Sequence, residues 1–403
     1  MLFFTSSITA KTIVVCASCE ATSVKTAIEQ AVDGDTILIK KGVYKEHSII
    51  VIEKSLTILG EDNPVIDGEL KGTIFSVKAK NVTIDGLTIK NVGNSFTKEF
   101  AAVLLSYAEN FTITNLTIEN AFFGILIEKS DTGLISGNTI SGNATEEAAA
   151  GNGIHLWHSK NVVIKNNNVF KMRDGIYLEF GSNSYIEKNT SKNNLRYGLH
   201  FMFSNDNEYH YNHFENNGAG VAVMFSKKII MYNNTFRKNW GPASYGLLLK
   251  EINDVELKNN IFEDNTVAIN ADGTNRIIYH QNNFIGNGYA IKVHGACYEN
   301  SFTENNFLHN SFDVAYAGRV NSNKFNNNYW SDYSGYDLDK DGIGDVSYRP
   351  VKLFSYLVNK TPEAIILLRS LFIDIIDFSE KVSPIFTPAE LVDENPKMKR
   401  IVW

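Results

Sequence analysis

The chain contains no apolar run long enough to cross a membrane, which takes about 18 residues. It also has no block of lysine or arginine, and its formal net charge is −7. A nucleic-acid groove, which would be lined with basic residues, is therefore not expected. Hydrophobic residues make up 43% of the sequence and charged residues 21%, which is ordinary for a folded protein with a large core.

Cysteine is scarce: the three residues are Cys16, Cys19 and Cys297. The first two form a C-A-S-C pair shortly after residues 1–10, which end in small residues and are interpreted as the remnant of an export signal. A disulfide, a metal or redox pair, and two unreacted thiols all remain compatible with this spacing. Cys297 is left over, and we expect it to be packed in the core.

A short phrase repeats along most of the chain: Gly or Ala followed by alternating apolar residues. It begins at Gly124, Gly153, Gly175, Gly198, Gly220, Gly246, Ala268 and Ala290. The steps are 22 or 23 residues, apart from one of 29 and one of 26. The polar stretch 143–152 accounts for the longest step and is expected to be a surface loop. Alternating strands at a fixed period, with no helical pattern between them, predict an all-β, right-handed parallel β-helix with rungs of about 22 residues.

A second phrase, Asn-x-Phe-x-x-Asn or a variant of it, recurs in the same register. Its first asparagines are Asn168, Asn189, Asn212, Asn234, Asn260, Asn282 and Asn305. In a parallel coil each residue lies ~4.8 Å from its counterpart one rung away, so that identical side chains stack. We expect these asparagines to form an internal, structural ladder of hydrogen-bonded amides.

Four segments follow from this pattern: residues 1–10, the coil with its N-terminal cap (11–335), an acidic loop (336–348) and a C-terminal tail (349–403). Val24, Ala27, Ile28 and Ala31 share one helical face, with Thr22 or Ser23 as the N-cap and Gly34 as the stop. This short helix is expected to close the N-terminal opening, because an open coil exposes strand edges and core.

Strand alternation sorts each rung into inward and outward residues, and the outward ones form two columns. One column contains Leu126, His155, Tyr177, His200, Ala222 and Leu248. The other contains Glu128, Trp157, Glu179, Met202, Met224, Lys250, Asp272 and His294. Met202 and Met224 are expected one rung apart, with His200 two residues from Met202. Thioether and imidazole suit Cu(I), so His200, Met202 and Met224 are candidate copper ligands, to which His155 is added by a longer reach.

Two other interpretations of this outward face stay open. It can be an apolar strip covered by the 143–152 loop or by a partner protein, or it can be a platform for sugar. Glu128 and Glu179 flank Trp157, two rungs apart, at ~9.6 Å by rung spacing. That separation is borderline for the carboxylate pair of an inverting glycosidase, and a polysaccharide lyase, a hydrolase or a carbohydrate-binding surface protein is thus the alternative class.

An acidic motif lies in the sequence YDLDKDGIGDVSY. Asp337, Asp339 and Asp341 alternate before Gly342, and Asp345 follows, as in the first half of an EF-hand-type loop. The glutamate expected at the twelfth position of such a loop is replaced by Tyr348. These four aspartates are candidate calcium ligands; an acidic turn held by side-chain to backbone hydrogen bonds is the alternative.

The tail becomes very apolar from Thr361 onwards. Pro362 is expected to open a helix that runs to about Phe378. A helix this apolar either folds back as the C-terminal cap or docks to a partner.

Several of these motifs together resemble the NosD family, the periplasmic β-helix proteins of nitrous-oxide reductase maturation. The matching stretches are GNGIHLWHS from Gly151, RDGIYLEF from Arg173, RYGLHFMFSNDN from Arg196, NNYWSDYSGYDLDKDGIGDVSYRP from Asn327 and PEAIILLRSLF from Pro362. The His/Met phrase of the family falls on His200 and Met202.

The resemblance implies a non-catalytic, periplasmic accessory protein that handles copper. It implies partnership with an ABC-type membrane permease and its ATPase, with a copper chaperone lipoprotein, and with the nitrous-oxide reductase that receives the copper. Association with the membrane would then run through the permease.

Overall fold

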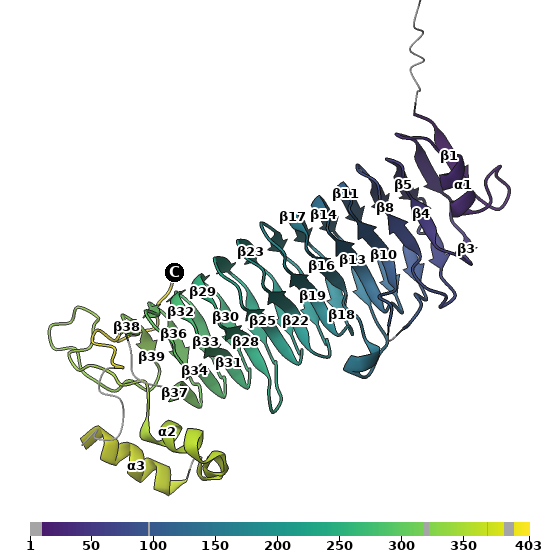
Figure 1. Cartoon of the computed structure of the whole chain (residues 1–403). Coiled ribbons are helices and arrows are strands. Elements are labelled where there is room, and N and C mark those ends of the chain that lie inside the picture. The colour runs from purple at the N-terminus through teal and green to yellow at the C-terminus, as the bar shows by residue number, and fades with distance from the viewer. Residues whose placement is uncertain (1–9, 96, 318–321, 369, 383–390) are drawn as a thin grey trace, which may run out of the picture. The chain divides into compact units, whose positions relative to one another are not determined.

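The computed structural model describes residues 10–95, 97–317, 322–368, 370–382 and 391–403. The chain divides into two compact units, Met1–Thr190 and Ser191–Trp403. Within each unit, every turn of the chain adds one strand to each of three parallel sheets, which we call A, B and C (Figure 1). This arrangement confirms the prediction of a parallel β-helix.

The strands of unit 1 follow one another in the same order in all three sheets. Sheet A contains β1 (Thr12–Val15), β2 (Thr36–Ile39), β5 (Thr57–Gly60), β8 (Thr83–Asp85), β11 (Glu109–Thr114), β14 (Asp131–Ser136), β17 (Lys160–Lys165) and β20 (Tyr185–Glu187). Sheet B contains β3 (Val43–Lys45), β6 (Val65–Asp67), β9 (Thr88–Lys90), β12 (Thr117–Glu119), β15 (Thr139–Ser141) and β18 (Asn168–Phe170). Sheet C contains β4 (Ile50–Ile52), β7 (Phe75–Val77), β10 (Ala101–Ser106), β13 (Phe123–Glu128), β16 (Ile154–Trp157) and β19 (Asp174–Glu179).

Unit 2 repeats this plan, and β21 (Thr190–Lys192) spans the boundary. Its sheet A contains β23 (Asn207–His210), β26 (Ile229–Tyr232), β29 (Asn253–Lys258), β32 (Asn275–His280), β35 (Ser301–Thr303) and β38 (Lys324–Asn326). Its sheet B contains β24 (His213–Glu215), β27 (Thr235–Arg237), β30 (Ile261–Glu263), β33 (Asn283–Ile285), β36 (Asn306–Leu308) and β39 (Tyr329–Trp330). Its sheet C contains β22 (Tyr197–Met202), β25 (Ala219–Met224), β28 (Tyr245–Lys250), β31 (Val267–Asp272), β34 (Tyr289–His294) and β37 (Phe312–Ala317).

Strand register confirms the repeat read from the sequence. Leu199 pairs with Val221, one 22-residue step away, and Val221 pairs with Leu247 across the 26-residue step. Ile125 pairs with Ile154 across the 29-residue step, whose extra residues include the short 3-10 helix η1 (Glu147–Ala149). Insertions therefore bulge out as loops and leave the register of the sheets intact.

Asparagine side chains form the expected ladder inside each unit. In unit 2 each asparagine of the ladder after the first accepts, through its Oδ1 atom, the main-chain N–H and the Nδ2–H of the asparagine one rung before it, at 2.9–3.1 Å. This ladder consists of Asn212, Asn234, Asn260, Asn282, Asn305 and Asn328. All are buried, and their amides satisfy polar backbone that the core would otherwise leave unpaired.

One predicted member of the ladder is wrong. In unit 1 the ladder runs through Asn138, Asn167 and Asn189, while Asn168 lies on β18 in register with Thr139. The residue before the ladder position adopts a left-handed conformation, as Asn166 does at φ 55°, and this turn points the next side chain inward. Because Asn166, Asn167 and Asn168 are consecutive, the sequence did not show which of them directly follows the turn.

The phenylalanines of the repeated phrase stack inside unit 2. Ring centroids are 4.5 Å apart between Phe236 and Phe262, 5.1 Å between Phe262 and Phe284, and 4.9 Å between Phe284 and Phe307. Trp330 ends the column at 4.1 Å from Phe307. Stacked, fully buried rings give the coil a continuous apolar core beside the asparagine ladder.

The N-terminal helix and the cysteines agree with two of the sequence-based expectations. Helix α1 (Val24–Gln30) buries Val24, Ala27 and Ile28, and the hydroxyl of Ser23 caps its first turn by accepting the N–H of Thr26. Cys16 and Cys19 form a disulfide, which decides between the three interpretations of the C-A-S-C pair. Cys297 is buried, and its sulfur contacts the N–H and the hydroxyl of Thr274 at 3.4 Å.

The C-terminal tail differs from the expected single apolar helix. It contains α2 (Leu353–Lys360), the 3-10 helix η2 (Pro362–Leu367) and α3 (Leu371–Val382). Pro362 thus opens only a short 3-10 turn. Phe354 and Val358 of α2 and Ile373 of α3 pack on Phe312 of β37, beside which Figure 1 shows these helices. Among the described helices, none is long and apolar enough to span a membrane.

The last thirteen residues close the end of the coil in unit 2. Asp393 is buried and forms backbone β-bridges with Phe325 and Tyr348. Lys397 forms a backbone β-bridge with Tyr329. The carboxylate of Asp393 accepts hydrogen bonds from the N–H and Nδ2–H of Asn328 and from the indole of Trp330, each at 3.0 Å. An extended segment from the far end of the chain therefore completes the final rung.

Candidate metal centre

The paired methionines lie on the outer face of sheet C in unit 2. Leu199 and Phe201 of β22 point into the core and are fully buried, so His200 and Met202 point outward. Met202 pairs directly with Met224 of β25, whereas His200 pairs with Ala222. The strands are about 4.8 Å apart at this register, so the two thioethers are neighbours, as the sequence predicted.

The surroundings fix this pair without enclosing it. The carbonyl oxygens of Met202 and Met224 accept the hydroxyls of Ser204 and Ser226, at 3.0 and 2.8 Å. Both methionines are partly exposed, and the next residues, Phe203 and Phe225, stack with ring centroids 5.1 Å apart. A soft, accessible sulfur pair with an aromatic border suits capture and release of a soft cation.

His200 is less accessible than its outward position implied. Its side chain is only 4% exposed, and its ring lies 4.8 Å from that of Tyr197 in an edge-to-face arrangement. The structure therefore brings Met202 and Met224 together at the surface and places His200 beside them, beneath neighbouring side chains.

His155, the fourth predicted copper ligand, belongs to unit 1. Its ring is stacked between Phe123 and Tyr177, with centroid distances of 5.9 and 4.6 Å. It is 5% exposed, and its Nε2 atom lies 3.9 Å from a carboxylate oxygen of Glu179. In this unit His155 therefore contacts two aromatic rings and lies close to a carboxylate.

Two charged residues missed by the sequence interpretation join the Glu128–Trp157–Glu179 column in unit 1. The column itself is confirmed by register. The Glu99 side chain is exposed overall, and partial desolvation of its carboxyl raises its pKa; the negative charges of Glu128 and Glu179 raise this pKa further, while Arg173 opposes them. Glu99 lies in the non-repetitive segment before β10, where periodicity carries no signal. Arg173 lies in one of the stretches that matched the NosD family.

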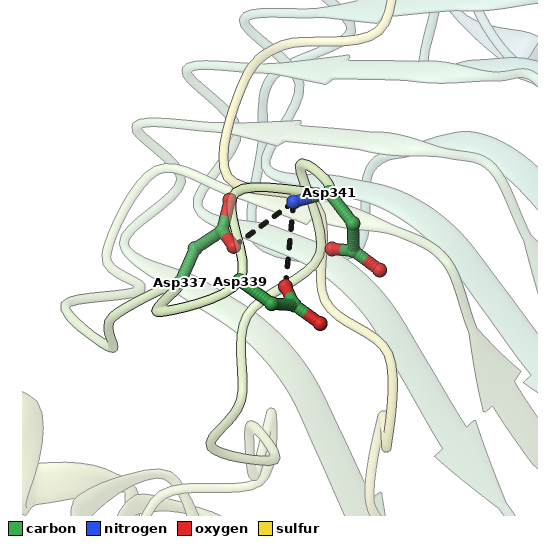
Figure 2. A group of neighbouring side chains, drawn as sticks. All are labelled: Asp337, Asp339 and Asp341. Carbon is green, nitrogen blue, oxygen red and sulfur yellow. Dashed lines mark hydrogen bonds between the residues drawn. The ribbon is translucent and has the colours of Figure 1, made fainter.

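The acidic loop brings three of the four predicted calcium ligands together. Figure 2 shows Asp337, Asp339 and Asp341, whose ligand atoms lie within 4.8 Å of one another. Asp345 is not part of that group, and its carboxylate accepts the N–H of Leu338 at 2.7 Å.

The same carboxylates also organise the turn. Asp337 and Asp339 accept the N–H of Asp341, at 3.2 and 3.3 Å (Figure 2). Asp337 also accepts the N–H of Gly342 at 2.9 Å. The carboxylate oxygens are suitable ligands for a hard cation such as calcium. The hydrogen bonds that they accept from the backbone are equally consistent with a turn that needs no cation.

Comparison with known proteins identifies the family. The family model described as "Periplasmic copper-binding protein (NosD)" matches residues 12–150 and 144–335. The chain belongs to the NosD family. The family resemblance and the periplasmic location inferred from the sequence are thereby confirmed.

Two curated relatives extend over nearly the whole chain. "Probable ABC transporter binding protein NosD" of Pseudomonas aeruginosa is 28% identical over 405 residues, which covers 87% of this chain and 85% of the relative. The protein of the same name from Stutzerimonas stutzeri is 27% identical and covers 86% of this chain and 84% of the relative.

Among solved structures, the surface adhesin PfbA of Streptococcus pneumoniae is similar in fold. It matches 76% of this chain and 86% of its own length, with a TM-score of 0.58. At 14% sequence identity this similarity shows the shared β-helix and nothing about function.

Proposed function

We propose that this NosD-family protein is a non-catalytic periplasmic subunit that takes up and releases Cu(I) for the assembly of nitrous-oxide reductase. The observation that carries the proposal is the direct register of Met202 with Met224 on an accessible outer face, with His200 two residues away. Thioether ligands favour Cu(I) over harder ions, and a site of few ligands binds weakly enough to pass its cargo on.

The test is a competition titration with Cu(I), carried out in the absence of oxygen on the protein whose Cys16–Cys19 disulfide is intact. Met202→Leu combined with Met224→Leu keeps side-chain volume and removes both sulfurs, so binding at this site should be lost while the circular dichroism stays unchanged. Met398→Leu, in the C-terminal segment, is the matched control and should bind like the natural protein. Unchanged affinity in the double variant would overturn the assignment.

The buried histidines need a separate comparison. His200→Phe should weaken Cu(I) binding if this imidazole completes the site, because phenylalanine preserves the ring and removes both nitrogens. His155→Phe tests the fourth predicted ligand in the same way. An affinity equal to that of the natural protein would remove the substituted histidine from the ligand set.

We propose further that α3 and η2 dock on the permease of an ABC-type complex. The ATPase, the copper chaperone lipoprotein and the reductase would be the other partners of the same copper-delivery system. The names of the two curated relatives support an ABC-transporter partner. Large apolar side chains are exposed here, with Ile366 at 86%, Leu371 at 74% and Phe378 at 69%. So much apolar surface in one place is typical of an interaction site.

Because the last rung is completed by Asp393, the docking role can be tested without opening the coil. Leu371→Gln combined with Phe372→Gln and Ile375→Gln should leave the melting temperature unchanged and abolish co-purification with the permease. Ile278→Gln, which replaces an exposed apolar residue on sheet A, is the control and should co-purify normally. A triple variant that unfolds or aggregates would identify the helices as a structural cap instead.

A second candidate function rests on the carboxylates of unit 1. Glu128 and Glu179 flank Trp157 in strand register, and Glu99 interacts electrostatically with both carboxylates and with Arg173, a combination that can hold or cleave a sugar chain. Glycan binding or cleavage that is lost in Glu128→Gln and retained in Glu304→Gln would favour this function over copper handling.

A further inference from the structure

The disulfide lies in a loop that the backbone already closes. Val15 bridges to Ala21, the N–H of Cys16 donates to the carbonyl of Ala21 at 3.2 Å, and the N–H of Cys19 donates to the carbonyl of Cys16 at 3.2 Å. A disulfide stabilises mainly by restricting the unfolded chain, and the effect is smallest for short loops. A bridge between residues three apart, across a turn held by hydrogen bonds, therefore adds little to the fold.

The position of the pair favours chemistry. Cys16 and Cys19 are both partly exposed, and Ala17 and Ser18 between them are exposed. Val15 and Ala21, on either side, are buried against the first rung, so the backbone that carries the sulfurs is anchored. Accessible, anchored cysteines at this spacing are the kind that exchange with external thiols.

We propose that Cys16 and Cys19 are a redox-gated Cu(I) site, closed as the disulfide and open as the dithiol. Thiolate sulfur is the protein ligand that Cu(I) prefers, and two thiolates on one short turn can hold it from both sides. The pair would be a second copper position, in unit 1, separate from the methionines of unit 2. This inference rests on the proposed role of the protein in handling copper.

The gating step needs a protein dithiol of the thiol–disulfide oxidoreductase class. One thiolate of that dithiol attacks a sulfur of the bridge and forms a mixed disulfide, which its second thiol resolves. Two electrons and two protons pass to Cys16 and Cys19, and the oxidoreductase leaves as a disulfide. Binding of Cu(I) then releases the two thiol protons, without any change in the oxidation state of the metal.

The test compares the full chain in its oxidised form with the chain reduced by a phosphine, which supplies no competing thiol. Alkylation and mass measurement establish the thiol state, and a chromophoric chelator competes for Cu(I) in the absence of oxygen. Reduction should add one bound Cu(I) per chain and a thiolate-to-copper charge-transfer band in the ultraviolet. Cys16→Ser combined with Cys19→Ser should lack both gains, whereas Cys297→Ser, which removes the buried thiol, should keep them.

Equal copper stoichiometry in the two redox states, or a disulfide that resists reduction in the folded chain, would overturn the inference. Alkylating the reduced natural protein gives a second way to block the pair without a substitution and should abolish the added site. Copper bound by the oxidised protein reports on the methionines instead. Loss of that signal alone counts against the proposed function, and loss of the redox-dependent increment alone counts against the gated site.

Discussion

The Oδ2 atom of Asp393 lies 3.0 Å from both the main-chain nitrogen and the side-chain amide nitrogen of Asn328. It occupies the position that the Oδ1 atom of an asparagine occupies at every earlier rung of this ladder in unit 2. A carboxylate accepts hydrogen bonds and donates none, so it can end a chain of donors without leaving a new donor unpaired.

Asp393→Ala should therefore destabilise unit 2. It leaves the main-chain N–H and one side-chain N–H of Asn328, and the indole N–H of Trp330, without their acceptor, and each buried unpaired group costs about 1–3 kcal/mol. Asp393→Asn retains a carbonyl oxygen at the same place and should recover most of the loss. Denaturant unfolding of the two variants checks this, and equal stability of Asp393→Ala and the natural chain would contradict it.

Removing one amide from the middle of the ladder should also lower stability. Asn234 is fully buried and accepts two hydrogen bonds from Asn212, so Asn234→Ala should cost about 1–3 kcal/mol. Asn94→Ala, at an exposed position, should leave the melting temperature unchanged. Copper binding should survive in both, because the ladder lies inside the coil; a ladder variant that melts normally would contradict the internal role.

Asp313 should make stability depend on pH. It lies buried beneath the tail, within 3.3 Å of Asn310 Nδ2 and 3.4 Å of the Tyr348 hydroxyl, and burial raises its pKa to about 6, with Lys352 opposing. The folded chain therefore holds this proton more tightly than the unfolded chain, whose aspartates have a pKa near 3.8. The stabilisation is complete below about pH 4 and is lost as the pH rises through about 6.

Asp313→Asn removes that titration while keeping a hydrogen-bond acceptor. Its melting temperature should fall less than that of the natural protein between pH 4 and 7. Because two pKa units correspond to about 3 kcal/mol, the variant should be the more stable form near pH 7. Parallel pH profiles for the two proteins would show that the pKa of Asp313 is not raised in the folded state.

Calcium should raise the melting temperature of the natural chain if the acidic loop binds it. Asp337→Asn combined with Asp341→Asn removes two charges from the cluster and should abolish the effect, which calorimetric titration measures directly. Asp62→Asn, which replaces an exposed turn residue of unit 1, should respond to calcium like the natural protein. Asp345→Asn tests whether the fourth predicted ligand contributes to calcium binding. If calorimetry detects no heat of calcium binding to the natural protein, the acidic loop is a turn held by its own hydrogen bonds.

The features predicted from sequence are those that repeat. Register along the coil follows from alternation and period, so the column containing Met202 and Met224 could be placed from the order of the residues alone. The helix at Val24–Gln30 also follows from local signals, namely its cap at Ser23 and its apolar face. Local propensity and the repeat pattern indicate the same structure at these positions, and such agreement allows a fold to be predicted from its sequence.

The parts that could not be predicted depend on contacts between unlike segments. Glu99 interacts electrostatically with the carboxylate column from outside the repeat, and Asp393 is hydrogen-bonded to Asn328, 65 positions earlier in the chain. Neither interaction produces a periodic pattern in the sequence. The deep burial of His155 and His200 was missed for a related reason, because strand alternation indicates which face a side chain is on and not what covers that face.

The ladder also has a direction. Each asparagine donates to the one that follows it in the chain, so its main-chain N–H and one of its side-chain N–H groups stay unpaired until the next rung is in place. A chain that emerges N-terminus first can therefore wind step by step but carries an incomplete edge as it grows. In unit 2 that edge waits for Asp393, which follows Asn328 by 65 positions, so the last rung cannot be completed until the helical tail between them has been released as well.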